Sequence, residues 1–142
     1  MNICYRVLKE LDNQDIEDIL DTALEGGISY WACLLNDQPE YKETLRELEK
    51  EKAEGKIKEI YYSTVIMRMM EMGRPVKFED AEAVEDADPE VWELNATKFT
   101  TGCELYEKHR GSIRQALDDG SFDAIEADCL IQYALFGEVV FG

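Results

Sequence analysis

The sequence has no apolar run close to the roughly 18 residues that a membrane-spanning helix needs, and it does not begin with a charged-then-apolar leader. Its four cysteines are far apart and form no Cys-x-x-Cys pair; they are Cys4, Cys33, Cys103 and Cys129. A disulfide framework is not expected in a chain of this size with so much apolar sequence, so reduced thiols are the default. We therefore expect a cytoplasmic protein that does not enter a membrane.

The motifs of common chemistries are also missing. The sequence contains no phosphate-binding loop, no serine triad and no EF-hand spacing. Its only histidine, His109, lies six residues after Cys103, where a helix does not place two side chains together. We predict no catalytic residue, no cofactor and no metal ligand, and hence a protein that is not an enzyme. Convergence of cysteines, His109 and carboxylates on zinc is the alternative, although no ligand spacing supports it.

Positive charge is scarce, with 15 Lys and Arg against 32 Asp and Glu, a net charge of −17 and a pI of about 4.3. Bases are absent from residues 10–41, 78–97 and 115–142, which hold nine, eight and six acids, and the rest of the chain is net positive by six. Such segregation can produce a negative face that attracts basic proteins and repels nucleic acid, so we expect no direct nucleic-acid binding. A solvated surface that serves only solubility is the alternative.

The 142 residues, 45% of them hydrophobic, suffice for a single globular domain over 1–142. The order of elements predicts an α+β fold that is mainly helical, with a small β-hairpin or sheet and a buried C-terminal helix. Residues 40–72 form a charged, methionine-rich helical insert. We expect its methionines to fill the core, with an adaptable binding surface as the alternative; they are Met67, Met69, Met70 and Met72.

Local signals place the first elements. Asp12 or Asn13 is a good N-cap for a helix to about residue 25, which the glycines at 26–27 end. The apolar run 28–35 is either a buried strand or a second short helix. Residues 1–11 are either a strand or a helical arm.

The middle of the chain combines helices with a hairpin. Two helices are predicted over 39–55 and 57–72, and a strand over 60–67 is the alternative to the second. Two alternating stretches, 76–78 and 91–94, then predict a two-stranded hairpin joined by an acidic connection.

The last part of the chain is predicted to be helical. Helices over 95–110 and near 112–117 lead into a closing helix, which Ser121 is expected to begin and Gly137 to end. That helix is apolar around most of its circumference, so we expect it to be buried. Residues 139–141 are short, apolar and strand-like.

Asp128 and Gln132 are the polar exceptions on this closing helix. They are one helical turn apart among apolar residues, so both should be partly buried. A buried carboxylate needs a partner, which is a backbone amide, an Arg, or the indole N–H of Trp31 or Trp92. We interpret the two residues as a structural polar pair. A binding or catalytic role is the alternative, because perturbed buried carboxylates also serve as general acids.

Three parts of the chain form a set: DIEDI (15–19) with ALEGGISYW (23–31), VKFEDAE (76–82) with WEL (92–94) and Phe99, and residues 127–132 with ALFGEVVFG (134–142). Together they resemble a family of small acidic proteins encoded mainly by phages and prophages of Firmicutes. The resemblance covers about residues 12–142, and its closing motif is the most specific part. The insert at 40–72 departs from the family pattern.

Small acidic phage proteins of this kind resemble inhibitors of bacterial defence nucleases, including anti-CRISPR proteins. The resemblance therefore implies an inhibitor that works in the host cytoplasm as a DNA mimic. Its acidic face would occupy the basic channel in which a CRISPR effector nuclease holds nucleic acid. The expected contact residues are ten acids within 12–25 and 79–90: Asp15, Asp18, Asp21, Glu79, Asp80, Glu82, Glu85, Asp86, Asp88 and Glu90.

Two other functions remain open at this point. One is a metal-binding protein, small-molecule enzyme or accessory factor centred on Asp128 and Gln132. The other is a structural or regulatory accessory protein of a phage. Metal analysis of the purified protein distinguishes the first from an inhibitor.

Overall fold

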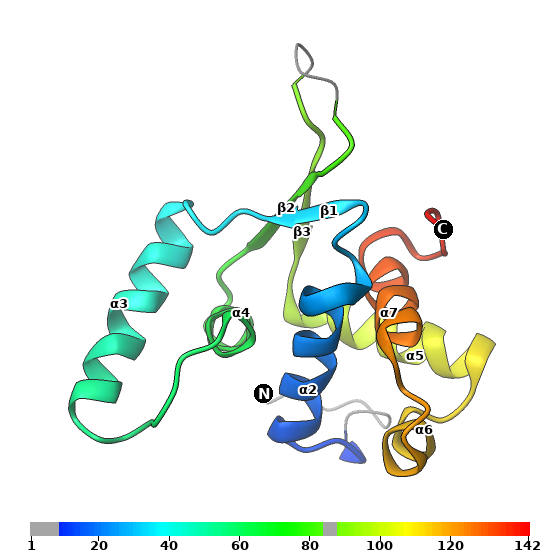
Figure 1. Cartoon of the computed structure of the whole chain (residues 1–142), viewed down its shortest axis with the longest axis horizontal. Coiled ribbons are helices and arrows are strands. Elements are labelled where there is room, and N and C mark those ends of the chain that lie inside the picture. The colour runs from blue at the N-terminus through cyan, green and yellow to red at the C-terminus, as the bar shows by residue number, and fades with distance from the viewer. Residues whose placement is uncertain (1–8, 84–87) are drawn as a thin grey trace.

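The structure, a computed structural model, describes residues 9–83 and 88–142. Over these residues the fold is α+β and mainly helical with one small antiparallel sheet, which confirms the predicted class (Figure 1). The elements follow one another in the order α2 (Asn13–Thr22), the π-helical turn η1 (Ala23–Gly27), β1 (Ala32–Leu34), α3 (Pro39–Ala53), α4 (Tyr62–Glu71), β2 (Val76–Asp80), β3 (Val91–Leu94), α5 (Ala96–Arg110), α6 (Ile113–Asp119) and α7 (Ala124–Phe136).

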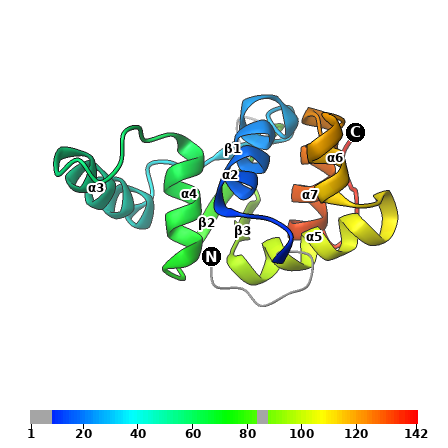
Figure 2. The same ribbon diagram turned by 90° about the horizontal axis from the view of Figure 1, so that it is seen from below.

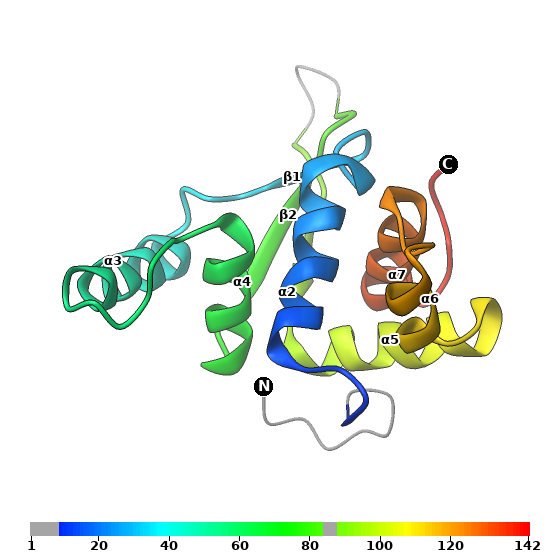
Figure 3. The ribbon, with the colours of Figure 1, turned by 60° about the horizontal axis from the view of Figure 1, so that its bottom comes forward.

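Four helices stand in a row in the order α3, α4, α2, α7, as Figures 2 and 3 show from two sides. Helix α4 contacts β2 and helix α7 contacts β3, so the sheet lies against this row. Helix α5 packs closely along α7. No described helix is long and apolar enough to cross a membrane.

The sheet has the strand order β1-β2-β3, and both pairs are antiparallel. The predicted hairpin is confirmed as β2 and β3, with Phe78 opposite Trp92. The uncertain run 28–35 contains a strand, β1, in which Ala32 pairs with Asp80. Val76 and Phe78 are buried and Lys77 between them is only half-buried, so one face of the sheet covers the core.

Local capping explains where the first helices begin and end. The Asp12 side chain accepts a hydrogen bond from the Asp15 N–H at 2.8 Å, which caps α2. The α-helix ends at Thr22, earlier than predicted, because the chain continues as the π-helical turn η1. In this wider turn each N–H bonds to the carbonyl five residues earlier, as the Ile28 N–H does to the Ala23 carbonyl. Glycine is required at Gly27, since a Cβ there would lie 2.9 Å from a backbone oxygen of α7.

The insert at 40–72 consists of two helices, α3 and α4, that pack against each other. The helix predicted over 57–72 is present only as α4, from Tyr62 to Glu71, and the alternative strand over 60–67 does not form. Tyr61, immediately before the helix, is 57% exposed. Three of the four methionines fill the core and Met72 is exposed.

Helix α7 is the most buried helix, and every residue from Ala127 to Ala134 lies inside the protein. Two expectations about its ends were wrong. Asp123, rather than Ser121, caps its start by accepting the Glu126 N–H. Residues 139–141 form no strand, because the backbone N–H groups there bond to a side chain of α7 instead of to a neighbouring strand.

Candidate functional site

Asp128 lies at the junction of η1 and α7 and accepts three hydrogen bonds. The close packing of Gly27 on α7 brings the next residues of the chain over this carboxylate. The Tyr30 hydroxyl donates to Oδ2 at 2.6 Å and the Trp31 indole N–H donates to Oδ1 at 2.8 Å. Gln132 donates its Nε2–H to Oδ1 at 2.8 Å. Burial, followed by the hydrogen bond to Asp128, raises the pKa of Tyr30 to about 12, so this tyrosine stays a donor.

Gln132 is fully buried and connects this carboxylate to the end of the chain. Its Oε1 accepts the N–H groups of Val140 and Phe141 at 2.7 and 2.8 Å, and its Nε2 also donates to the Phe141 carbonyl at 3.2 Å. All polar atoms of the Gln132 amide are therefore used by partners. The arrangement holds the segment after α7 in place, which is a structural task.

An aromatic cluster covers the same region. The Phe141 ring stacks on Trp31 with centroids 4.9 Å apart and an angle of 8° between the planes. Phe136 and Trp92 meet edge to face at 5.2 Å. The Asp128 carboxylate thus has donors on both of its oxygens, and it also lines a hollow of about 380 Å³ together with Tyr30 and Cys129.

The three described cysteines, Cys33, Cys103 and Cys129, form no metal site with His109, and Cys4 lies outside the described residues. Among the described residues no group of three His, Cys, Asp or Glu side chains is arranged to hold a metal ion. Cys103 is buried in α5, and burial raises the pKa of its thiol well above the usual range. His109 is exposed and stacks on Tyr133 with centroids 5.5 Å apart.

The predicted contact acids of α2 differ in availability. Asp15 is tied to Arg114 at 2.6 Å and to the Asp12 N–H, and these partners outweigh burial and hold its pKa below the usual value. Asp18 is exposed and accepts a hydrogen bond from Gln14. Asp21 is half-buried at the edge of a groove. Asp18 and Asp21 therefore form no ion pair with any residue of 9–83 or 88–142, whereas Asp15 has a structural role.

The predicted contact acids of the hairpin lie on strands and flanking segments that project away from the helices (Figure 1). Glu79 and Asp80 are half-buried on β2, and the Asp80 carboxylate accepts the Glu82 N–H at 2.8 Å. The other described acids of this group are exposed: Glu82, Asp88 and Glu90. Glu85 and Asp86 lie outside the described residues.

Ion pairs concentrate on the insert. Within the described residues, its bases and Arg74 pair with six carboxylates: Glu43, Glu47, Glu51, Glu54, Glu59 and Glu71. Arg110 and Arg114 pair with three more, namely Asp15, Asp118 and Glu126. The other described acids of the base-free stretches form no ion pair, so most of these carboxylates are not neutralised by a neighbouring base.

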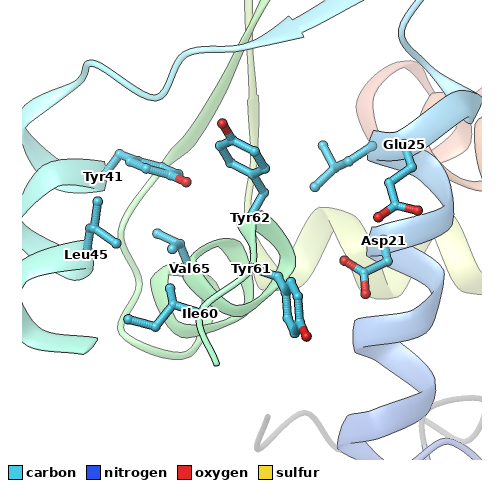
Figure 4. Close-up of a pocket in the computed structure, with 9 residues that line it drawn as sticks. Asp21, Glu25, Tyr41, Leu45, Ile60, Tyr61, Tyr62 and Val65 are labelled. Atoms are coloured by element: carbon cyan, nitrogen blue, oxygen red, sulfur yellow. The ribbon is translucent and has the colours of Figure 1, made fainter. Parts of the chain in front are cut away.

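A groove between α2, α3 and α4 was not predicted. It has a volume of about 560 Å³, and Figure 4 shows Asp21 and Glu25 on one side, Tyr41 on the other, and Tyr61 and Tyr62 between them. Only the consecutive tyrosines of the sequence hinted at it, because its walls come from segments 20 to 40 residues apart. No protein-family model, curated protein or solved structure matches this chain.

Proposed function

We propose that this chain is a stoichiometric inhibitor whose acidic surface occupies the basic nucleic-acid-binding channel of a bacterial defence effector, with a CRISPR nuclease as the first target to test. The division of charge supports the proposal. Ion pairs neutralise much of the insert, whereas the hairpin and the second half of α2 carry carboxylates without ion-pair partners in the described structure. The resemblance to small acidic phage proteins selects the class of target.

The physical basis is competition for the same cations. Lys and Arg side chains that bind phosphates also accept closely spaced carboxylates, because both ligands are anions with oxygen acceptors. The exposed acids Glu82, Asp88 and Glu90 lie on segments that project from the body, where a channel wall can reach them. Inhibition by this route needs no catalysis and no cofactor. It requires one inhibitor for each effector and weakens as salt screens the charges.

A charge-neutralising variant of the hairpin tests the proposal. The triple variant Glu82→Gln, Asp88→Asn, Glu90→Gln keeps the size of each side chain and removes three charges. We expect it to slow association with the effector by about tenfold at low salt, since charges at the edge of an interface act mainly on the association rate. Binding is measured by surface plasmon resonance at two salt concentrations, alongside an interference assay in cells.

The matched control removes the same charge elsewhere. Glu49, Glu104 and Glu138 are exposed, lie outside the two predicted contact stretches and form no ion pair in the described structure. Their triple replacement by glutamine should change the association rate by less than about threefold. Absence of binding to every nucleic-acid-handling effector of a panel, even at low salt, would contradict the proposal. Equal loss in both triple variants would show that only net charge matters.

A further inference from the structure

The groove between α2, α3 and α4 has an apolar floor and an aromatic lip. Leu45 and Val65 line its depth, while Tyr61 and Tyr62 are 57% and 56% exposed at its opening. These are the two most exposed tyrosines described in the structure. Its volume of about 560 Å³ falls within the range of about 300–1,000 Å³ that is usual for ligand-binding sites.

The charge at the groove is negative only. Asp21 and Glu25 line the α2 side, and no lysine or arginine lines any part of it. Neither carboxylate forms an ion pair within the described structure, whereas other carboxylates such as Glu51 and Asp15 do. A cation that enters the groove would meet two carboxylates on one side and tyrosine rings on the other.

Tyr41 supplies an independent sign that the groove accepts a ligand. Its side chain is 4% exposed, and its hydroxyl points from α3 toward the groove (Figure 4). This hydroxyl has no hydrogen-bond partner in the part of the chain that the structure describes, and it is not among the polar atoms that are sealed from solvent without a partner, so it is free to bond with a group that enters the groove. Burial, with the neighbouring Tyr62, raises the pKa of Tyr41 to about 12, so the group stays a neutral hydroxyl that both donates and accepts.

We propose that this groove binds an arginine side chain, presented next to an apolar residue by a basic segment of a partner protein. The guanidinium would stack on Tyr61 or Tyr62 and pair with Asp21 and Glu25. The adjacent apolar side chain would cover Leu45 and Val65. The identity of the partner rests on the proposed function, whereas the chemistry of the groove does not and is tested separately.

Arginine fits this groove better than lysine does. A guanidinium is planar, stacks on aromatic rings, donates in a fork to carboxylates and is weakly hydrated, so it enters a half-apolar site at lower cost than an ammonium group. A protein segment fits better than a free cation because the groove offers more apolar than polar surface. Its contacts combine an aromatic anchor with charge, which is the usual composition of a binding hot spot.

The first experiment uses peptides alone. An acetylated, amidated peptide with arginine and leucine at helical spacing is titrated into the full chain by calorimetry, together with a matched peptide in which citrulline, which has the same shape and no charge, replaces arginine. We expect the arginine peptide to bind at least about tenfold more tightly than the citrulline peptide. A lysine peptide should lie between them.

Variants of the chain then locate the binding site. D21N/E25Q should weaken binding of the arginine peptide by at least about tenfold, and Y61A/Y62A by at least about fivefold. These side chains are half-buried or exposed, so circular dichroism should show an unchanged fold. The control E49Q/E104Q removes the same charge away from the groove and should change the affinity by less than about twofold.

Several outcomes overturn the inference. The first is that the citrulline peptide binds as tightly as the arginine peptide, and the second is that D21N/E25Q binds the arginine peptide with unchanged affinity. The third is that the chain forms a dimer and that D21N/E25Q dissociates it, because a second copy would then occupy the groove. The inference and the proposed function can also fail separately. If effector binding responds to the hairpin variant but not to D21N/E25Q, the groove is not part of the interface. If the arginine peptide binds at the groove but no effector does, the proposed function fails.

Discussion

Replacing Gly102 with alanine tests how tightly α5 and α7 pack. Gly102 lies in the middle of α5 and is buried against α7. A Cβ built on it would lie 2.6 Å from the Cβ of Ala134, and 2.8 Å from both the Cα and the amide nitrogen of the same residue. Two of these three atoms are backbone, so no side-chain rotation relieves the overlap. The helices must move apart.

Two effects of opposite sign decide the result. Alanine favours a helix over glycine by about 1 kcal/mol, which would stabilise the variant. Overpacking a well-packed core costs about 1–3 kcal/mol and occasionally more, and contact with backbone places this site at the upper end. The separation also loosens the contacts of buried neighbours such as Tyr106 and Leu130. We therefore expect a net loss of about 2 kcal/mol in the free energy of unfolding.

Urea unfolding followed by circular dichroism measures this loss. The matched control is Gly26→Ala, because a Cβ there would meet only the Ala124 Cβ at 4.0 Å, an ordinary contact. That variant should be as stable as the wild type or slightly more stable. The double variant G102A/A134G should recover only part of the loss, since the Cα and amide nitrogen remain. A G102A protein at least as stable as the wild type would refute the close contact.

Three further predictions concern other parts of the core. The Arg110 guanidinium bonded to Glu126 holds the pKa of that carboxyl below its usual value. The pair of Arg110 with the ionised Glu126 therefore stabilises the fold above about pH 5, and this stabilisation is lost as the pH falls through the lowered pKa. In urea titrations, Glu126→Gln should lower the free energy of unfolding by about 1–3 kcal/mol at pH 7 and by clearly less near pH 3. Phe141→Ala removes the ring stacked on Trp31, which should cost about 1–2 kcal/mol and shift the tryptophan emission to the red; an unchanged spectrum would contradict the seating of the chain end. The Ser63 hydroxyl is buried without a partner in the described structure, so Ser63→Ala should raise the free energy of unfolding by about 0.5–1 kcal/mol and with it the midpoint of thermal unfolding. A lower midpoint would show that this hydroxyl has a hydrogen-bond partner in the folded protein.

Signals that act within a few residues were sufficient to predict much of the fold. The cap predicted at Asp12 or Asn13, the turn glycine Gly137 and the alternation of 76–78 with 91–94 all marked elements that the structure contains. Each depends on hydrogen bonds or side-chain periodicity inside one segment, so the sequence alone carries it. The apolar circumference of the last helix likewise predicted its burial.

Features that join distant segments needed the tertiary structure. The strand-like pattern of 139–141 was misleading because Gln132 takes the backbone N–H groups that a neighbouring strand would have bonded. Trp31 bonds to Asp128 across 97 residues, and only the fold selects it over the other partners that burial demanded. The sequence by itself determined the segregation of charge, since residue order decides which helix or strand carries the acids. The tertiary structure decided which carboxylates are neutralised and formed the tyrosine-lined groove, because both depend on which helices become neighbours.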